Sequence, residues 1–61
     1  MTVEQARELL GSSFVDFHEL GLPRIDTAVL QALRAQLVLE PSNRLTEFGI
    51  ASIDAELGAR S

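Results

Sequence analysis

The 61-residue chain contains no cysteine, and this absence is the main constraint on how it can fold. No disulfide can hold it together, and one histidine without cysteine cannot complete a zinc finger. A chain this short forms one domain near the lower limit for independent folding, so we treat residues 1–61 as a single domain. Its stability must come from an apolar core, from self-association or from a partner. Apolar residues make up 46% of the sequence, which is typical of a globular protein.

Start and stop signals predict three to four short helices, and therefore a mainly α fold. Thr2 and Gln5 have the spacing of a capping box, which predicts a first helix that ends at Gly11 in the left-handed conformation. A second helix is predicted from Ser13 to Gly21.

The second predicted helix carries two of the three phenylalanines. Phe14, Phe17 and Leu20 share one helical face, so we expect them to supply much of the core. Pro23 biases Leu22 to an extended conformation and ends the segment.

Asp26 is a favourable N-cap for a third helix, with Ile25 and Leu30 placed as a hydrophobic staple. Apolar residues continue the helical period at Ile25, Val29, Leu33 and Leu37. The alanines at positions 28, 32 and 35 favour the helix and allow close packing, while Thr27, Gln31 and Arg34 mark its solvent-exposed face.

The fourth predicted helix begins at Thr46 or at Ser52 and ends at Gly58. Leu45 and Ile50 are spaced as a staple around the first of these starts. We expect residues 59–61 to fray.

Residues 37–46 change period, because Leu37 and Leu39 alternate with Val38 and Glu40. Residues 41–43 form a turn signal with proline, serine and asparagine. This pattern predicts either one small β-hairpin or an extended loop.

The net charge is −4, and the five arginines are scattered along a chain that has no lysine. Nucleic-acid binding requires several cations on one face, so this charge balance disfavours it without excluding it. No apolar run is long enough for a membrane span or a secretion signal, and we therefore predict a cytoplasmic protein without membrane contact.

The sequence does not contain the residue patterns that catalysis requires. His18 is the only histidine, and the serines are not in a nucleophile-elbow pattern. Asp16, His18 and Glu19 do not share one helical face, so they do not predict a metal site. No glycine loop is arranged to hold a phosphate. We predict a protein that is not an enzyme and needs neither cofactor nor metal.

The segments ELGLPRIDTAVLQAL, LVLEPSNRLTEFG and IDAEL together resemble the small winged helix-turn-helix domain of MarR- and PadR-like regulators. The resemblance covers about two-thirds of the chain and implies a winged-helix order of elements. Residues 14–20 would form the first helix, 26–36 the recognition helix, 41–44 the wing and 46–57 the following helix. DNA would then be contacted by Arg24, Gln31, Arg34 and Arg44.

Two other resemblances lead to different functions. EFGIASIDAEL is similar to the segment around the modified serine of acyl and peptidyl carrier proteins, which would be Ser52, with Ala51 in place of the expected acidic residue. LQALRAQLVLEPSNRL resembles the docking domains of assembly-line synthetases.

Apolar residues beyond the needs of a small core predict an interaction surface, and we assign Leu10, Val15, Leu22 and Val38 to it. The leading hypothesis is a small acidic regulatory protein, of phage or bacterial type, that binds a protein partner or a second copy of itself. A DNA-binding winged-helix regulator is the main alternative. An assembly-line docking domain and a degenerate carrier protein are the further ones.

Overall fold

A computed structural model describes all 61 residues, and every regular element in it is helical. The elements are α1 (Val3–Ser12), the π-helix η1 (Asp16–Gly21), the 3₁₀ turn η2 (Leu22–Arg24), α2 (Thr27–Leu39) and α3 (Arg44–Arg60). The predicted mainly α fold is confirmed.

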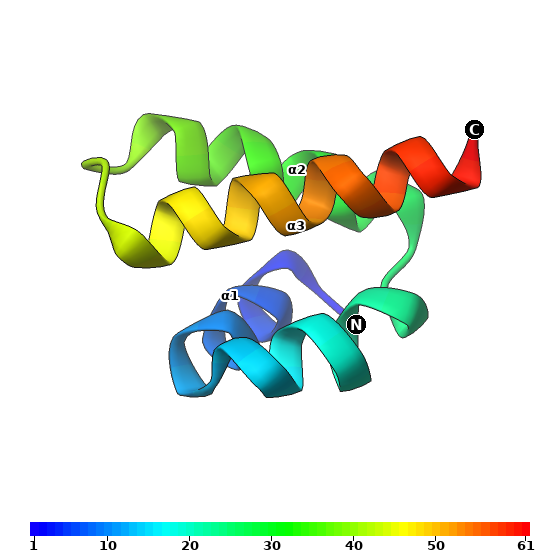
Figure 1. The fold of residues 1–61 in the computed structure, drawn as a ribbon. Helices are drawn as coiled ribbons and strands as arrows, with labels where there is room; N and C mark the ends of the chain where they lie inside the picture. The colour runs from blue at the N-terminus through cyan, green and yellow to red at the C-terminus, as the bar shows by residue number, and fades with distance from the viewer.

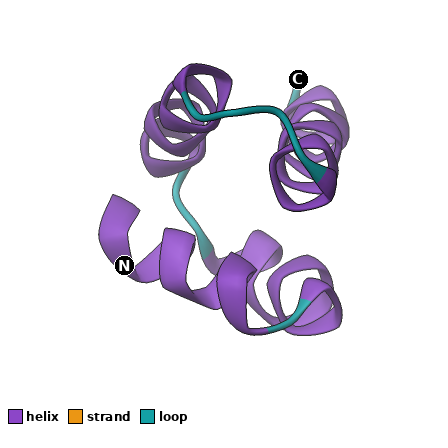
Figure 2. Cartoon of the chain, turned by 90° about the vertical axis from the view of Figure 1, so that its left-hand side faces the viewer, coloured by secondary structure: helices purple, strands orange, loops and turns teal.

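The helices form two layers. α2 and α3 are joined by a short loop into an antiparallel hairpin, which lies over α1 and η1 (Figure 1). Figure 2 looks nearly along α2 and α3 and shows α1 running across them. The core lies between the two layers.

Of the two alternatives predicted for residues 37–46, the β-hairpin is wrong and the loop is limited to residues 40–43, because residues 37–39 complete α2 and α3 begins at Arg44. The helical period of Leu30, Leu33 and Leu37 continues to the end of α2, and all three side chains are buried. The alternation of Leu37 and Leu39 is not that of a strand, since Leu39 is the exposed residue at the end of a helix. Without strands there is no wing at residues 41–44, and the structure does not support a winged-helix order.

Nine apolar side chains form the core: Ala6, Leu10, Phe17, Leu22, Ile25, Leu30, Leu33, Leu37 and Ile53. Only Phe17 of the three residues predicted on the core face of the second helix is among them, while Phe14 and Leu20 are exposed. The π-helix explains part of this difference: its wider turn places Leu20 outside, whereas a regular helix would put it near Phe17.

Two predicted helix starts are confirmed by hydrogen bonds. Gln5 N donates to Thr2 Oγ1 (3.2 Å) and Thr2 N donates to Gln5 Oε1 (2.8 Å), which completes the capping box. Asp16 N donates to Ser13 Oγ (3.3 Å) where the next helical segment begins. Asp26 is the N-cap residue of α2 as predicted, although its side chain makes no capping hydrogen bond.

The predicted left-handed end at Gly11 is wrong, because α1 continues to Ser12 and no glycine has a positive φ. Leu22 is helical rather than extended, with φ −50° and ψ −49°. The reason is that Pro23 lies in the first turn of η2, where its missing N–H breaks no helical hydrogen bond.

α3 is longer than predicted at both ends. Its N-cap is Asn43, whose side chain accepts from Thr46 N (3.1 Å) while Thr46 Oγ1 accepts from Asn43 N (2.9 Å). Thr46 is therefore the third residue of the helix and closes a capping box. At the other end the helix continues through Gly58 to Arg60, where we expected a frayed tail.

Arg60 fixes this end of α3 to the start of α2. Its Nε donates to Glu56 Oε2 (2.8 Å), its Nη1 to Thr27 Oγ1 (3.1 Å) and its Nη2 to the Leu22 carbonyl (2.9 Å). The first of these contacts is also an ion pair. The Arg60 guanidinium thus joins α3 to η2 and to α2.

Candidate functional site

The four residues assigned to an interaction surface do not form one. Leu10 and Leu22 belong to the core, with 0% and 1% of their surface exposed. Val15 and Val38 are exposed, but Val38 lies on α2 and Val15 lies between α1 and η1, in the other layer. Two of the four residues assigned to the surface are therefore core residues, and the other two lie in different layers of the fold.

α2 carries one of two apolar surfaces. The buried side chains Leu30, Leu33 and Leu37 lie on one side of the helix. At 100° per residue, positions 28, 32, 35 and 39 fall on the opposite side, and all of them are exposed. We call this side the α2 face and define it by Ala28, Ala32, Ala35, Val38 and Leu39, with Gln31 and Gln36 at its edges.

The α2 face has large apolar side chains at its C-terminal end. Leu39 is 87% exposed and Val38 is 56% exposed. The exposed residues between positions 27 and 39 include no charged side chain. Arg34 is half-buried at the flank and is neutralised by Asp54. An apolar, uncharged helix face next to solvent is characteristic of a protein contact surface.

The second apolar surface lies on residues 14–20. Val15 is 62% exposed and Leu20 is 61% exposed. Asp16 and Glu19, which have no ion-pair partner, are interspersed with these two residues. This surface is therefore acidic as well as apolar.

Next to it, Phe14 stacks on Phe48 of α3 with ring centroids 4.6 Å apart, and His18 meets the same ring edge-on at 6.3 Å. These contacts attach the exposed segment to α3. Through this stacking Phe14 joins the two layers, and the outer edge of the Phe14 ring stays exposed to solvent.

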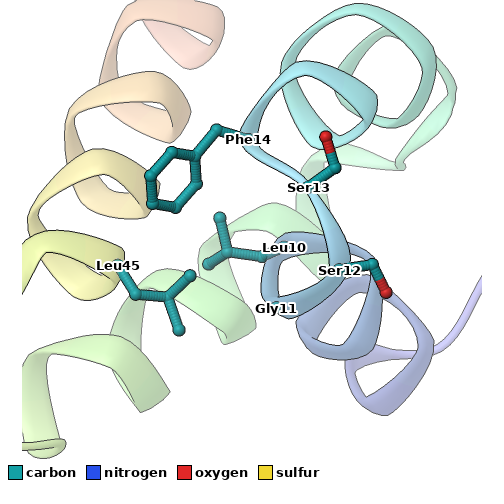
Figure 3. A pocket seen from close by; sticks show the side chains of 6 residues that line it. All are labelled: Leu10, Gly11, Ser12, Ser13, Phe14 and Leu45. Atoms are coloured by element: carbon teal, nitrogen blue, oxygen red, sulfur yellow. The ribbon is translucent and has the colours of Figure 1, made fainter.

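One open depression of about 250 Å³ lies where α1 ends. Leu10, Phe14 and Leu45 point toward one another across it, whereas the hydroxyl groups of Ser12 and Ser13 point away (Figure 3). Small-molecule sites usually have volumes of about 300–1,000 Å³ and several convergent polar groups. The depression is smaller, and its polar groups do not converge on it.

The residues that the winged-helix resemblance assigned to DNA contact are not gathered on one surface. Arg34 Nε donates to Asp54 Oδ1 (2.6 Å), so its charge is engaged. Arg24 precedes α2 and Arg44 follows it, so the two are separated by the length of a 13-residue helix, about 20 Å. Gln31 is exposed at the edge of the α2 face.

Ser52 is buried, with 7% of its surface exposed in the middle of α3. A serine that receives a prosthetic group needs an accessible hydroxyl, so this position does not favour a carrier function. Histidine and acidic side chains nowhere gather in a group of three that would suit a metal ion. None of the helices has the length and apolar character that a membrane crossing needs.

Arg7 and Glu40 form the best-defined ion pair. Arg7 Nη2 donates to Glu40 Oε1 (2.8 Å) and Arg7 Nε donates to Glu40 Oε2 (3.1 Å), which joins α1 to the end of α2. These hydrogen bonds hold the pKa of the Glu40 carboxyl below its ordinary value and raise the pKa of the Arg7 guanidinium. The pair neutralises the carboxylate that follows the α2 face.

Sequence reasoning placed Val38 on the candidate surface but missed Leu39 and the three alanines. The signal was present, because α2 has nine apolar residues among 13 and they occur on both sides of the helix. Comparison with protein-family models, with curated proteins and with solved structures finds no match for this chain.

Proposed function

We propose that this chain is a protein interaction module, without catalytic activity of its own, that binds another protein through the α2 face. The observation that carries the proposal is the exposure of Leu39, at 87%, beside Val38 on a helix face that has no charge. Burying apolar surface is the main driving force of protein association. The absence of charge means that no ion must be desolvated when this face is covered.

The apolar character of the α2 face is not needed for folding. The other side of α2 already supplies Leu30, Leu33 and Leu37 to the core. A helix that needs to be apolar on one side only is usually charged or polar on the other. α2 exposes polar Gln31 and Gln36 only at the edges of the α2 face, and the centre of that face is apolar from Ala28 to Leu39, which supports a contact with a second protein.

Two matched substitutions test the proposal. Val38→Asp and Val15→Asp place the same charge at valines of similar exposure, on the two different apolar surfaces. Each variant and the parent are immobilised and exposed to a lysate of the source cell, and the retained proteins are identified and quantified. Far-ultraviolet circular dichroism confirms that all three remain helical.

We expect a protein that the parent and Val15→Asp retain and that Val38→Asp loses. Loss with Val15→Asp alone would assign binding to residues 14–20 and contradict the proposal. Equal retention by all three would contradict it as well, because neither apolar surface would then take part.

A further inference from the structure

We infer that the protein bound by the α2 face is a second copy of this chain, with two α2 helices packed antiparallel about a two-fold axis. The inference rests on the proposed function and adds the identity of the partner. Two features of the structure support it: the distribution of charge over the surface and the spacing of residues along the face.

The charge distribution leaves the α2 face as a surface on which two copies can meet with little repulsion. Each chain carries a net charge of −4, which opposes self-association. Three of the five arginines are already engaged in ion pairs. The carboxylates without an ion-pair partner are Glu4, Glu8, Asp16, Glu19, Asp26 and Glu47.

None of these carboxylates lies on the α2 face; the nearest in sequence is Asp26, at the N-cap of the helix. The surface around Val15 and Leu20 differs, because a two-fold contact there would bring Asp16 and Glu19 of both copies together. That surface suits a basic partner. The α2 face suits a copy of itself.

The spacing along the α2 face matches a helix–helix seam. Ala28, Ala32, Ala35 and Leu39 follow one another at intervals of four, three and four residues. This is the spacing of alternating core positions in a coiled coil, where residues of one helix fit between those of another. The flanking positions hold Gln31, Gln36 and Val38, which add neither attraction nor repulsion between charges.

The sizes of these residues determine the orientation of the two helices. In a parallel pair, Leu39 would meet Leu39 at one end and Ala28 would meet Ala28 at the other, which leaves one end crowded and the other empty. In an antiparallel pair, Leu39 of each copy lies beside Ala28 of the partner subunit, and Ala32 lies beside Ala35 of the partner subunit. Large then meets small at both ends of the seam and small meets small at its centre, so neither end is crowded.

The dimer is expected to be weak. A stable interface of ordinary size takes about 800 Å² from each partner, which is about a fifth of the 3880 Å² surface of this chain. A single face of a 13-residue helix buries less area than this. We therefore expect the mass in solution to rise with concentration, from 6.7 kDa toward twice that value, across about 10 µM to 1 mM.

Sedimentation equilibrium of three proteins tests this inference. Ala35→Glu places a carboxylate at the centre of the seam in both copies. Ala55→Glu makes the same exchange at an exposed position of α3, so the two variants have equal net charge and equal helix-propensity cost. We expect Ala35→Glu to weaken association at least ~10-fold, through like charges in a closed contact, and Ala55→Glu to follow the parent.

A monomeric parent up to about 1 mM would overturn the second-copy inference. The proposed function would still stand if capture remained sensitive to Val38→Asp, so the two failures are distinguishable. Equal dimerisation of the parent and Ala35→Glu would also overturn the inference, because the contact would then lie elsewhere.

The orientation is tested separately by cross-linking, for which the absence of native cysteine is convenient. Ala28→Cys and Leu39→Cys are prepared as single variants and mixed under mild oxidation. The antiparallel arrangement predicts that the mixed disulfide forms several-fold faster than either homodimeric one. Faster formation of the homodimeric disulfides would refute that orientation.

Discussion

Gly49 of α3 packs against a leucine of α1 and a leucine of α2. A Cβ atom at this position would lie 2.7 Å from Cδ1 of Leu37 and 2.8 Å from Cδ2 of Leu10. Both leucines are fully buried; Leu10 also borders the depression at the end of α1, whereas Leu37 belongs to the core, so the Leu37 methyl group has little free space into which to move. We therefore predict that Gly49→Ala destabilises the protein, although alanine is the better helix former.

The magnitude follows from two opposing effects. Alanine in place of glycine in a helix interior stabilises by about 1 kcal/mol. An extra methyl group forced into a packed core costs about 1–3 kcal/mol, and two overlaps place Gly49→Ala in the upper part of that range. The net destabilisation is about 1–2 kcal/mol, or a Tm roughly 4–16 °C lower for a chain of this size.

Gly58 is the matched control in the same helix. A Cβ there meets nothing within 4 Å, so Gly58→Ala should be neutral or stabilising by up to about 1 kcal/mol. Urea denaturation of the parent and both variants, followed by far-ultraviolet circular dichroism, measures the free energies of unfolding. If Gly49→Ala proved as stable as Gly58→Ala, the close packing of α3 on the two leucines would be wrong.

Three further predictions concern the core, a helix cap and an ion pair. Leu10→Ala should lower the free energy of unfolding by about 2–5 kcal/mol and Val15→Ala by no more than about 0.5, and equal effects would contradict the burial of Leu10. Asn43→Ala should cost about 1 kcal/mol because it removes the acceptor for an N–H in the first turn of α3; an unchanged urea midpoint would refute the cap. Since Arg7 lowers the pKa of Glu40 in the folded state, the pair contributes stability above the ordinary pKa of glutamate and loses it as the pH falls through the lowered pKa. Urea titrations across acidic pH should show the parent and Glu40→Gln converging at low pH, and a constant difference would contradict this ion pair.

Local signals in the sequence predicted most of the helical structure correctly. The capping box of Thr2 and Gln5 depends on residues three apart, so it can be recognised without knowing how the rest of the chain folds. The same applies to Ser13. Thr46 was assigned the wrong role because both it and Asn43 are good N-cap residues, and only the fold shows that the helix begins at the earlier one.

The candidate site was harder to predict because exposure depends on contacts between elements. Leu10 and Leu22 appeared to exceed the needs of the core, yet the core of this small fold uses them both. Phe14 appeared to be a core residue, but it stacks on Phe48 at the edge of the fold and stays partly exposed. Neither outcome follows from the order of apolar residues within one helix.

The α2 helix shows why an apolar pattern alone gives an incomplete prediction of function. Its periodicity identifies a core side through Leu33 and Leu37, and that assignment is correct. The alanines appear neutral in such a pattern, because alanine favours a helix in either environment. Once the fold places them outside, together with Leu39, the same residues form a second apolar side without a covering element. The core needs only one side of α2 to be apolar. Charged residues on the other side would be tolerated, as they are elsewhere in this chain with its net charge of −4. Their absence from the α2 face is what the proposed contact with another protein would explain.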